Sequence, residues 1–399
     1  MHIRNLKVSG LLSFGPKGID LPLTNLNVLI GPNGSGKSNL IEVLALLKAA
    51  PNNLTAPMMN FGGVREWFYK GSEQEDIVNI SAEVRSLSAG RPTKKQSVPG
   101  EPFCEHRILL QKNGTEVALV AEHVRRVGNL NVGPATGRYY HFSRLSAALY
   151  DQDGLRVPLQ KNSISPSESI LSQIKDPEGR YPVISELQEL YGSFHFFRNW
   201  QFGVLAAVRR EQPTNLRNDY LAEGGENLPL VVSKIRQRAK REILENLKEL
   251  YGGITDIDTP VDNGTVQLFL EEYGKRWIPA SRLSDGTLRY LCLLAILLHP
   301  DPSPLVVLEE PELGLHPDII PHVGKLIKEA SKQMQIVMTT HSQVLLDAFS
   351  KSPEDVIVCS RGEEGTRCER LNAEKLGRWL EDHTLGELWN MGEIGGTRW

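Results

Sequence analysis

One octapeptide near the start of the chain constrains the fold more than any other feature. Residues 31–38 read GPNGSGKS, which matches the pattern G-x-x-x-x-G-K-[ST] in full. This loop follows the apolar segment 27–30, typical of a buried strand, and precedes 38–49, where apolar residues recur at helical spacing. A strand, glycine loop and helix in this order predict an α/β fold. In such a fold, backbone N–H groups and a helix start surround phosphate oxygens.

The loop predicts binding of ATP together with Mg²⁺. Lys37 is expected to reach the β- and γ-phosphates, and the Ser38 hydroxyl to ligate Mg²⁺. A glycine-rich turn carrying a solvated lysine is the alternative, which the strand–helix context disfavours. The expected nucleotide-binding residues are Gly31, Asn33, Gly34, Ser35, Gly36, Lys37, Ser38 and Asn39.

Two later apolar segments end in side chains that suit the same chemistry. Segment 305–308 is followed by Glu309, which we assign to the metal, and by Glu310, which we assign to the attacking water. Segment 335–340 ends in His341, suited to contact the γ-phosphate and to orient the water. Alone, these residues could be two acids after a strand and an ordinary histidine. A phosphate loop in the same chain favours the functional interpretation.

A fourth segment, 281–290, opens a helix. Ser284 is a suitable N-cap, and Gly286 would allow close approach of another backbone. By itself the segment does not distinguish a capped helix from a binding motif.

Together these segments resemble the ABC-type ATPases. LSDGT at 283–287 resembles the family signature, Glu309-Glu310 resembles Walker B with the catalytic glutamate, and His341 resembles the switch histidine. Within that superfamily, the likeness is to the RecF/SMC/OLD-like branch, whose stand-alone predicted ATPases are similar to this chain in several segments. These segments are 5–10, 283–289, 309–317 and 385–396.

The resemblance implies an α/β fold, an ABC-type ATPase head (a P-loop NTPase with a mixed sheet and flanking helices) with an inserted, mainly helical lobe. We expect residues 1–150 to form an N-terminal ATPase lobe with an antiparallel β-subdomain, 151–255 a helical insertion, and 256–399 the C-terminal ATPase lobe. It also implies a homodimer or higher homo-oligomer. The residues of one subunit that would face the γ-phosphate bound by the other are Ser284, Asp285 and Gly286.

The sequence departs from the family pattern at several positions. Glu309 replaces the usual Walker B aspartate, and His316 stands where transporters keep the D-loop aspartate. The Q-loop glutamine is not fixed, and Gln201 and Gln212 are its candidates. No Toprim-like acidic motif follows the strand predicted at 356–359, and no sustained heptads predict a long coiled coil.

Composition limits the remaining classes. Lys and Arg total 45 against 48 Asp and Glu, which excludes a generally basic nucleic-acid-binding surface. A local nucleic-acid or partner patch stays open beside the ordinary alternative of a solvated helix. No apolar run approaches a membrane span and no signal core is present, so we expect a cytoplasmic protein without membrane contact. The patch residues are Lys234, Arg236, Arg238, Lys240 and Arg241.

The resemblance also implies a biological role. It suggests slow ATP hydrolysis in DNA-related surveillance, either antiphage defence or repair, with control of a separately encoded effector such as a Toprim-like nuclease. Two alternatives remain: a nucleotide-binding subunit of a transporter, and a scaffold that binds ATP structurally with negligible turnover.

Overall fold

The computed structural model describes residues 1–60, 62–71, 76–90, 102–127, 137–160, 164–198 and 200–395. Its core is a six-stranded sheet in which five strands are parallel and the last is antiparallel. In spatial order the strands are β10 (His195–Phe197), β17 (Leu305–Glu309), β18 (Gln335–Thr339), β3 (Leu26–Ile30), β19 (Val356–Gly362) and β20 (Gly365–Arg370).

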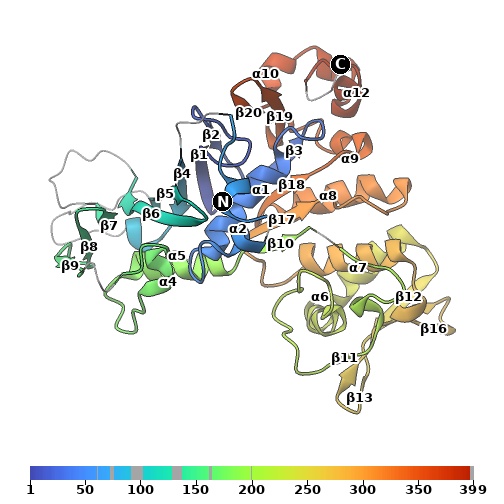
Figure 1. Ribbon diagram of the computed structural model, residues 1–399. Helices are drawn as coiled ribbons and strands as arrows, with labels where there is room; N and C mark the ends of the chain where they lie inside the picture. The colour runs from blue at the N-terminus through green and yellow to red at the C-terminus, as the bar shows by residue number, and fades with distance from the viewer. Residues whose placement is uncertain are drawn as a thin grey trace.

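A second sheet has eight antiparallel strands and stands beside the core, on the left in Figure 1. Along its two longest strands, Phe103–Asn113 and Glu116–Arg126, buried residues largely alternate with partly exposed ones, as expected for a sheet with one covered face. In spatial order its strands are β2 (Ile19–Pro22), β1 (Ile3–Ser9), β4 (Ile77–Arg85), β5 (Phe103–Asn113), β6 (Glu116–Arg126), β7 (Arg138–Ser143), β8 (Ala147–Tyr150) and β9 (Arg156–Pro158).

The core strands are apolar along their whole length because both of their faces are covered. All five residues of β3 and of β18 are buried. Leu29, Val307 and Val337 pack with helix α1 (Lys37–Ala49) and the antiparallel sheet. Val306 and Met338, on the other face, pack with the helices that follow the signature segment. The helix that begins at the phosphate loop therefore lies between the two large sheets.

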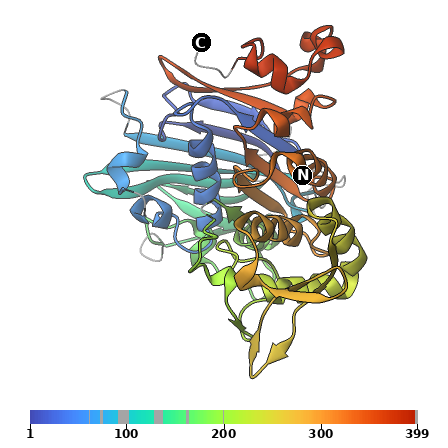
Figure 2. The ribbon, with the colours of Figure 1, turned by 90° about the vertical axis from the view of Figure 1, so that its right-hand side faces the viewer.

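The remaining elements cover these sheets or form a separate lobe. Figures 1 and 2 show this lobe, with the small strands, at the lower end of the molecule and the C-terminal helices at the upper end. The helices are α2 (Ala56–Asn60), α3 (Val64–Trp67), α4 (Ile170–Gln173), α5 (Pro182–Gly192), α6 (Leu228–Leu250), α7 (Asp285–Leu297), α8 (Ile320–Ala330), α9 (Gln343–Asp347), α10 (Ala373–Leu376), α11 (Trp379–Asp382) and α12 (Leu385–Asn390). The small sheets are β11 (Gln212–Pro213), β14 (Thr265–Val266) and β13 (Val261–Asp262), and β12 (Ile254–Asp258), β15 (Phe269–Glu272) and β16 (Arg276–Pro279).

The range 151–255 is expected to be one helical insertion, but in the structure it is divided among the antiparallel sheet, the core sheet and the lower lobe. Strand β9 extends the antiparallel sheet, and β10 is an edge strand of the core sheet. Helices α4 and α5 pack under the antiparallel sheet, whereas α6 packs with α7 in the lower lobe. The sequence pattern missed this division because β10 has only three residues, too few to show a periodicity.

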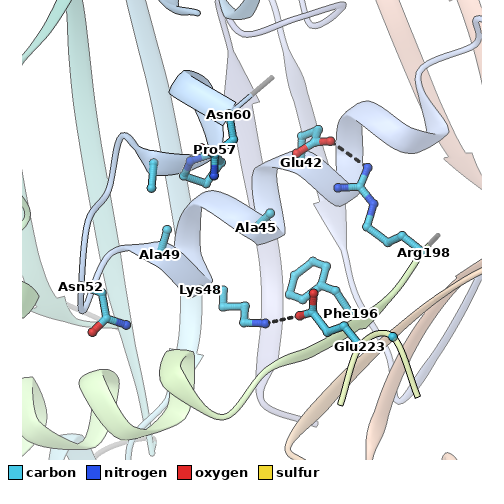
Figure 3. Close-up of a pocket in the computed structure, with 12 residues that line it drawn as sticks. Glu42, Ala45, Lys48, Ala49, Asn52, Pro57, Asn60, Phe196, Arg198 and Glu223 are labelled. Carbon is cyan, nitrogen blue, oxygen red and sulfur yellow. Dashed lines mark hydrogen bonds and ion pairs between the residues drawn. The ribbon is translucent and has the colours of Figure 1, made fainter. Parts of the chain in front are cut away.

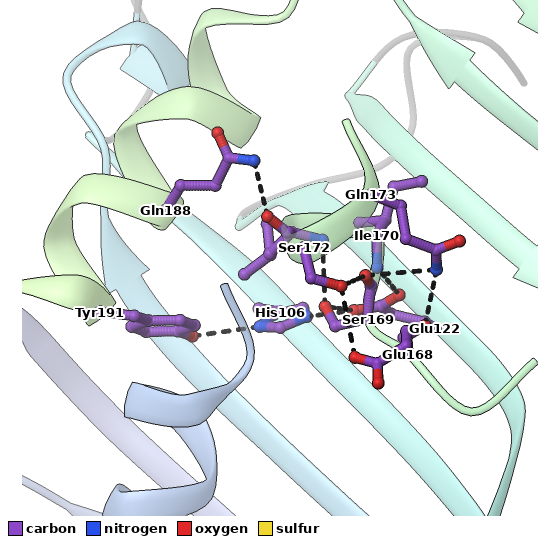
Figure 4. A network of polar contacts seen from close by, with 10 residues as sticks. His106, Glu122, Glu168, Ser169, Ile170, Ser172, Gln173, Gln188 and Tyr191 are labelled. Carbon is purple, nitrogen blue, oxygen red and sulfur yellow. Dashed lines mark hydrogen bonds and ion pairs between the residues drawn. The ribbon is translucent and has the colours of Figure 1, made fainter. Parts of the chain in front are cut away.

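A buried polar network joins α4 and α5 to the antiparallel sheet (Figure 4). The Glu122 carboxylate on β6 accepts hydrogen bonds from His106 Nε2 at 2.9 Å, Ser169 Oγ at 2.5 Å and the backbone N–H of Ile170 at 2.9 Å. The other ring nitrogen of His106 contacts the Tyr191 hydroxyl at 3.1 Å. Since each of these polar groups has a partner, their burial is compatible with a stable core.

Candidate ATP and magnesium site

The phosphate loop connects the end of β3 to the start of α1, as the sequence predicts. Gly31 and Gly36 have φ values of 144° and 101°, which side-chain-bearing residues rarely adopt. A Cβ on Gly36 would lie 2.2 Å from Thr366 Oγ1, on strand β20. The loop therefore needs glycine at this position both for its backbone conformation and for space.

Polar groups of the loop have contacts that are compatible with the expected phosphate site. The Lys37 ammonium donates to the carbonyl oxygens of Gly31 at 2.7 Å and Pro32 at 3.1 Å, so it lies over the loop. Burial lowers the pKa of Lys37 from its ordinary value. The Ser35 hydroxyl is buried without a hydrogen-bond partner among the described residues, which suits a group that meets a phosphate oxygen. Asn39, expected to bind nucleotide, donates to Ser13 Oγ at 2.6 Å.

Ser38 and Glu309 meet although they are 271 positions apart in the chain. Glu309 ends β17, and Ser38 Oγ donates to its Oε1 at 2.8 Å. Adjacent oxygens of an octahedral Mg²⁺ shell with bonds of 2.0–2.1 Å are about 2.9 Å apart. The two oxygens therefore fit neighbouring positions around Mg²⁺, and the longer glutamate reaches this site.

Glu310 and His341 lie together at the ends of adjacent strands. His341 Nε2 is 3.7 Å from Glu310 Oε1, and each side chain is 38% exposed, so both remain accessible to water. Glu310 has a φ of +46°, a left-handed conformation that costs a non-glycine residue about 1–3 kcal/mol. Burial, aided by the charge of Lys37, lowers the pKa of His341, so the imidazole is neutral at pH 7.

Glu312 also belongs to this cluster, and the sequence gave it no role. Its Oε1 accepts hydrogen bonds from Thr340 Oγ1 at 2.6 Å and from the His341 backbone N–H at 3.1 Å. Burial raises the pKa of Glu312. The carboxylate thus holds the segment that carries His341, a function that no local pattern around Glu312 indicates.

The signature segment forms a capped and restrained loop at the start of α7. Ser284 is the N-cap, as predicted, and its Oγ accepts from the Thr287 backbone N–H at 3.1 Å. A Cβ on Gly286 would lie 3.0 Å from the Gly314 carbonyl oxygen, so the expected close approach is present. Arg209 forms an ion pair with Asp285 and donates to the Leu283 carbonyl oxygen at 2.6 Å.

Neither candidate for the Q-loop glutamine explains the geometry next to Glu309. The Gln212 side chain donates to the carbonyl oxygens of Ala207 and Arg210 within its own turn. Gln201 is exposed after β10. Instead, Arg198 Nε donates to Glu309 Oε2 at 3.2 Å. A search for glutamine could not have found this residue.

The basic cluster on α6 is compensated by acidic residues. All five of its cations form ion pairs: Lys234 and Arg238 with Asp301, Arg236 with Asp258, Lys240 with Asp256, and Arg241 with Glu245. The non-helical backbone of Ala239 also interrupts this stretch of α6. Nucleic-acid binding by the cluster stays an untested prediction, and these pairs give it no support.

Comparison with known families assigns the chain to one of them. Residues 26–96 and 163–347 match the family described as "AAA domain, putative AbiEii toxin, Type IV TA system". The chain belongs to this family. The match covers the phosphate loop, the signature segment, Glu309, Glu310 and His341. The protein is an ABC-type ATPase of the RecF/SMC-like branch, as the sequence predicts.

Curated relatives resemble short parts of the chain. A segment of 115 residues, 27% of the chain, is 32% identical to the chromosome partition protein Smc of Mycoplasma genitalium, and 117 residues, 29% of the chain, are 28% identical to the DNA repair protein RecN of Aquifex aeolicus. A third segment, 96 residues and 24% of the chain, is 36% identical to ABC transporter A family member 2 of Arabidopsis thaliana. The matches span 12%, 21% and 9% of the lengths of these relatives, respectively.

Solved structures of SMC heads share the fold. The SMC head bound to the C-terminal winged-helix domain of ScpA superimposes with a TM-score of 0.58 at 16% identity, over 94% of this chain and 99% of that chain. The SMC head with an extended coiled coil from Pyrococcus furiosus superimposes with a TM-score of 0.57 at 15% identity, over 96% of this chain and 99% of that chain.

Among the described residues, no helix combines the length and apolar character needed to cross a membrane.

Proposed function

We propose that the protein binds ATP with Mg²⁺ and hydrolyses it slowly. The observation that carries the proposal is the convergence of Ser38, Glu309, Glu310 and His341 at the carboxyl ends of three neighbouring parallel strands. Such strand ends are where α/β sheets bind their ligands. Phosphoryl transfer needs groups that hold the metal and groups that orient the nucleophile, and the contacts between Ser38 and Glu309 and between Glu310 and His341 support those roles.

The roles of the residues follow from their chemistry. Lys37 and the loop N–H groups would hold the phosphates, and Ser38 and Glu309 would hold Mg²⁺, which neutralises charge on the phosphate oxygens when it is bound. Glu310 is placed to orient a water and to accept its proton as the water oxygen bonds to the γ-phosphorus and the bond to the ADP oxygen breaks. His341, neutral at pH 7, would hold the same water or a γ-phosphate oxygen.

The protein is proposed to assemble through ATP held between two heads. Ser284 and Asp285 are exposed at the start of α7, and Gly286 is partly exposed. Because Arg209 fixes this loop, its exposed groups are ordered for a partner before assembly. We therefore infer that Ser284, Asp285 and Gly286 of one copy contact the γ-phosphate in another, in a homodimer or higher homo-oligomer.

The biological role is proposed to be DNA-related surveillance, in antiphage defence or repair, with control of a separately encoded effector such as a nuclease. The family description names a putative toxin of a type IV toxin–antitoxin system, and one relative is a DNA repair protein. An SMC head of the same fold is bound to a domain of another protein, ScpA, which supports partner binding by such heads.

The proposal is tested with the Glu310→Gln variant, which keeps the size of the side chain but removes the base. Its turnover is expected to fall by about 10²–10⁴-fold, while its mass in light scattering increases when Mg²⁺-ATP is added. A further increase with duplex DNA would support the surveillance role. Equal, near-zero turnover of wild type and variant would favour a structural ATP scaffold, and a mass unchanged by ATP would contradict assembly through ATP.

A further inference from the structure

Arg198 occupies a distinctive position beside the metal-binding carboxylate. Strand β10 pairs in parallel with β17, with His195 opposite Val306 and Phe197 opposite Leu308. The next residue, Arg198, is therefore level with Glu309. Arg198 and Glu309 are 111 positions apart in the sequence, and they meet because of the register in which β10 pairs with β17.

Arg198 completes a chain of contacts among four polar side chains, which begins and ends on α1. Ser38 and Glu42 lie one turn apart on the same face of α1. Ser38 Oγ donates to Glu309 Oε1 at 2.8 Å, Arg198 Nε donates to Glu309 Oε2 at 3.2 Å, and Arg198 Nη2 donates to Glu42 Oε1 at 2.7 Å. The side chains of Arg198, Glu309 and Glu42 are only 20%, 20% and 14% exposed. These contacts are thus shielded from solvent more than a surface ion pair.

The two oxygens of Glu309 have different partners. Oε1 faces Ser38, the other expected Mg²⁺ ligand, whereas Oε2 faces the guanidinium. Arginine has no acceptor atom and cannot bind a cation itself, so it acts on the metal only through Glu309. A glutamate has one more rotatable bond than the aspartate usual in this family, and ordering it costs more side-chain entropy. A hydrogen bond to the second oxygen reduces that freedom before the metal arrives.

Glu42 resolves an electrostatic conflict in this arrangement. A guanidinium next to a divalent cation is repelled by it. The 2.7 Å contact with Glu42 pairs the positive charge of Arg198 with a carboxylate, so Arg198 can orient Glu309 as part of a neutral pair. Removing Glu42 would leave Arg198 paired with Glu309 alone, so that the guanidinium and the metal would share one carboxylate.

We propose that Arg198 is a positioning residue of the magnesium site: it fixes Glu309 so that Oε1 faces the metal beside Ser38, and Glu42 neutralises its charge. The inference rests on the proposed function, Mg²⁺-ATP binding. Hydrogen-bond partners of metal ligands are typically worth 10–100-fold in metal affinity. Loss of Arg198 is therefore expected to weaken Mg²⁺ binding without weakening the contacts that the phosphate loop makes with nucleotide.

The surroundings of Arg198 make the test practicable. Arg198 and Glu42 line a cavity of about 580 Å³ between α1, α2 and the loop at 223–224 (Figure 3). Truncation of Arg198 enlarges an existing cavity, so Arg198→Ala is expected to fold. Lys48 lines the same cavity and pairs with Glu223 at 2.5 Å. Lys48→Ala is therefore a matched control, because this substitution removes a cation from the same cavity and leaves the contacts of Glu309 intact.

The experiment measures binding of a fluorescent, non-hydrolysable ATP analogue while Mg²⁺ is titrated, and again in EDTA. Arg198→Ala is expected to raise the half-saturating Mg²⁺ concentration by about tenfold or more, with affinity in EDTA unchanged. Arg198→Lys keeps a positively charged donor but cannot reach both carboxylates with two separate nitrogens, so it should raise the half-saturating Mg²⁺ concentration by less. Glu42→Gln should also raise this concentration. Lys48→Ala should match wild type.

The outcomes separate the two proposals. A Mg²⁺ requirement that is unchanged or lower in Arg198→Ala and Arg198→Lys, with wild type still Mg²⁺-dependent, would overturn the positioning role and leave the proposed function intact. Equal losses of affinity in Mg²⁺ and in EDTA would also overturn it, because they indicate general damage to the site. Wild-type protein that binds no nucleotide, or binds it without regard to Mg²⁺, would overturn both.

Discussion

Replacement of Glu122 by alanine tests how firmly the segment 164–192 is held to the antiparallel sheet. Glu122 is fully buried and accepts three hydrogen bonds. The Ser169 hydroxyl can rotate toward another acceptor, but the Ile170 N–H and His106 Nε2 would stay buried without a partner. Each such donor costs about 1–3 kcal/mol, and losing one partner of a buried pair typically costs about 3–5 kcal/mol. We therefore expect Glu122→Ala to lower the free energy of unfolding by about 3–5 kcal/mol.

Urea unfolding followed by circular dichroism measures this loss, and hydrogen exchange with mass spectrometry locates it. Protection of backbone amides should fall first in residues 164–192, which the network attaches to the sheet. Glu122→Gln keeps one acceptor oxygen and should cost less. Glu178→Ala is the control, because Glu178 is 67% exposed and its ion pair with Arg180 lies at the surface, a contact worth about 0–1 kcal/mol. A loss within about 1 kcal/mol for Glu122→Ala, or unchanged protection in 164–192, would refute the reasoning.

Three further predictions concern the ATP site. Gly36→Ala should abolish ATP binding, measured by calorimetry, because its Cβ would lie 2.2 Å from Thr366 Oγ1 and because residue 36 has a φ of 101°. An affinity within twofold of wild type would contradict this. Since burial lowers the pKa of His341, the rate of ATP hydrolysis should stay level above pH 6.5 and fall only below it, as the imidazole becomes protonated. His341→Gln should remove this fall at low pH, and a fall that begins above pH 7 in the wild type would contradict the prediction. Arg209→Ala should free the loop that carries Asp285 and weaken ATP-dependent assembly in light scattering, with nucleotide affinity in the monomer unchanged; equal loss of both would indicate misfolding instead.

Prediction from sequence succeeded where the chemistry is carried by a continuous stretch of chain. The phosphate loop, the strand ending at Glu309 and the Ser284 N-cap all lie where their local patterns placed them. In each case the signal is an apolar periodicity next to residues whose backbone or side chain can adopt only a few arrangements. Such signals do not depend on what packs against them.

Residues that act through tertiary neighbours escaped prediction. The Glu312 carboxylate accepts a hydrogen bond from the backbone N–H of His341, which follows a different strand. Arg198 meets Glu309 because the register of two neighbouring strands places them at the same level. Arg198 lies in no segment that the sequence singles out. Glu312 lies in the segment 309–317 that carries the family resemblance, but the sequence assigns it no role of its own. The basic cluster on α6 shows the converse, because four of its five cations pair in the fold with acidic residues outside the helix, namely Asp256, Asp258 and Asp301.

The sequence by itself therefore determined the class of this protein, an ABC-type ATPase head, because each segment that carries the resemblance is continuous in the chain. Only the tertiary structure decided how the range 151–255 is divided, because a three-residue strand, β10, is ordered by its neighbour β17 and not by its own composition. The same pairing decided which cation meets Glu309. Hydrogen bonding between strands sets that register, and it is a property of two segments that the sequence keeps far apart.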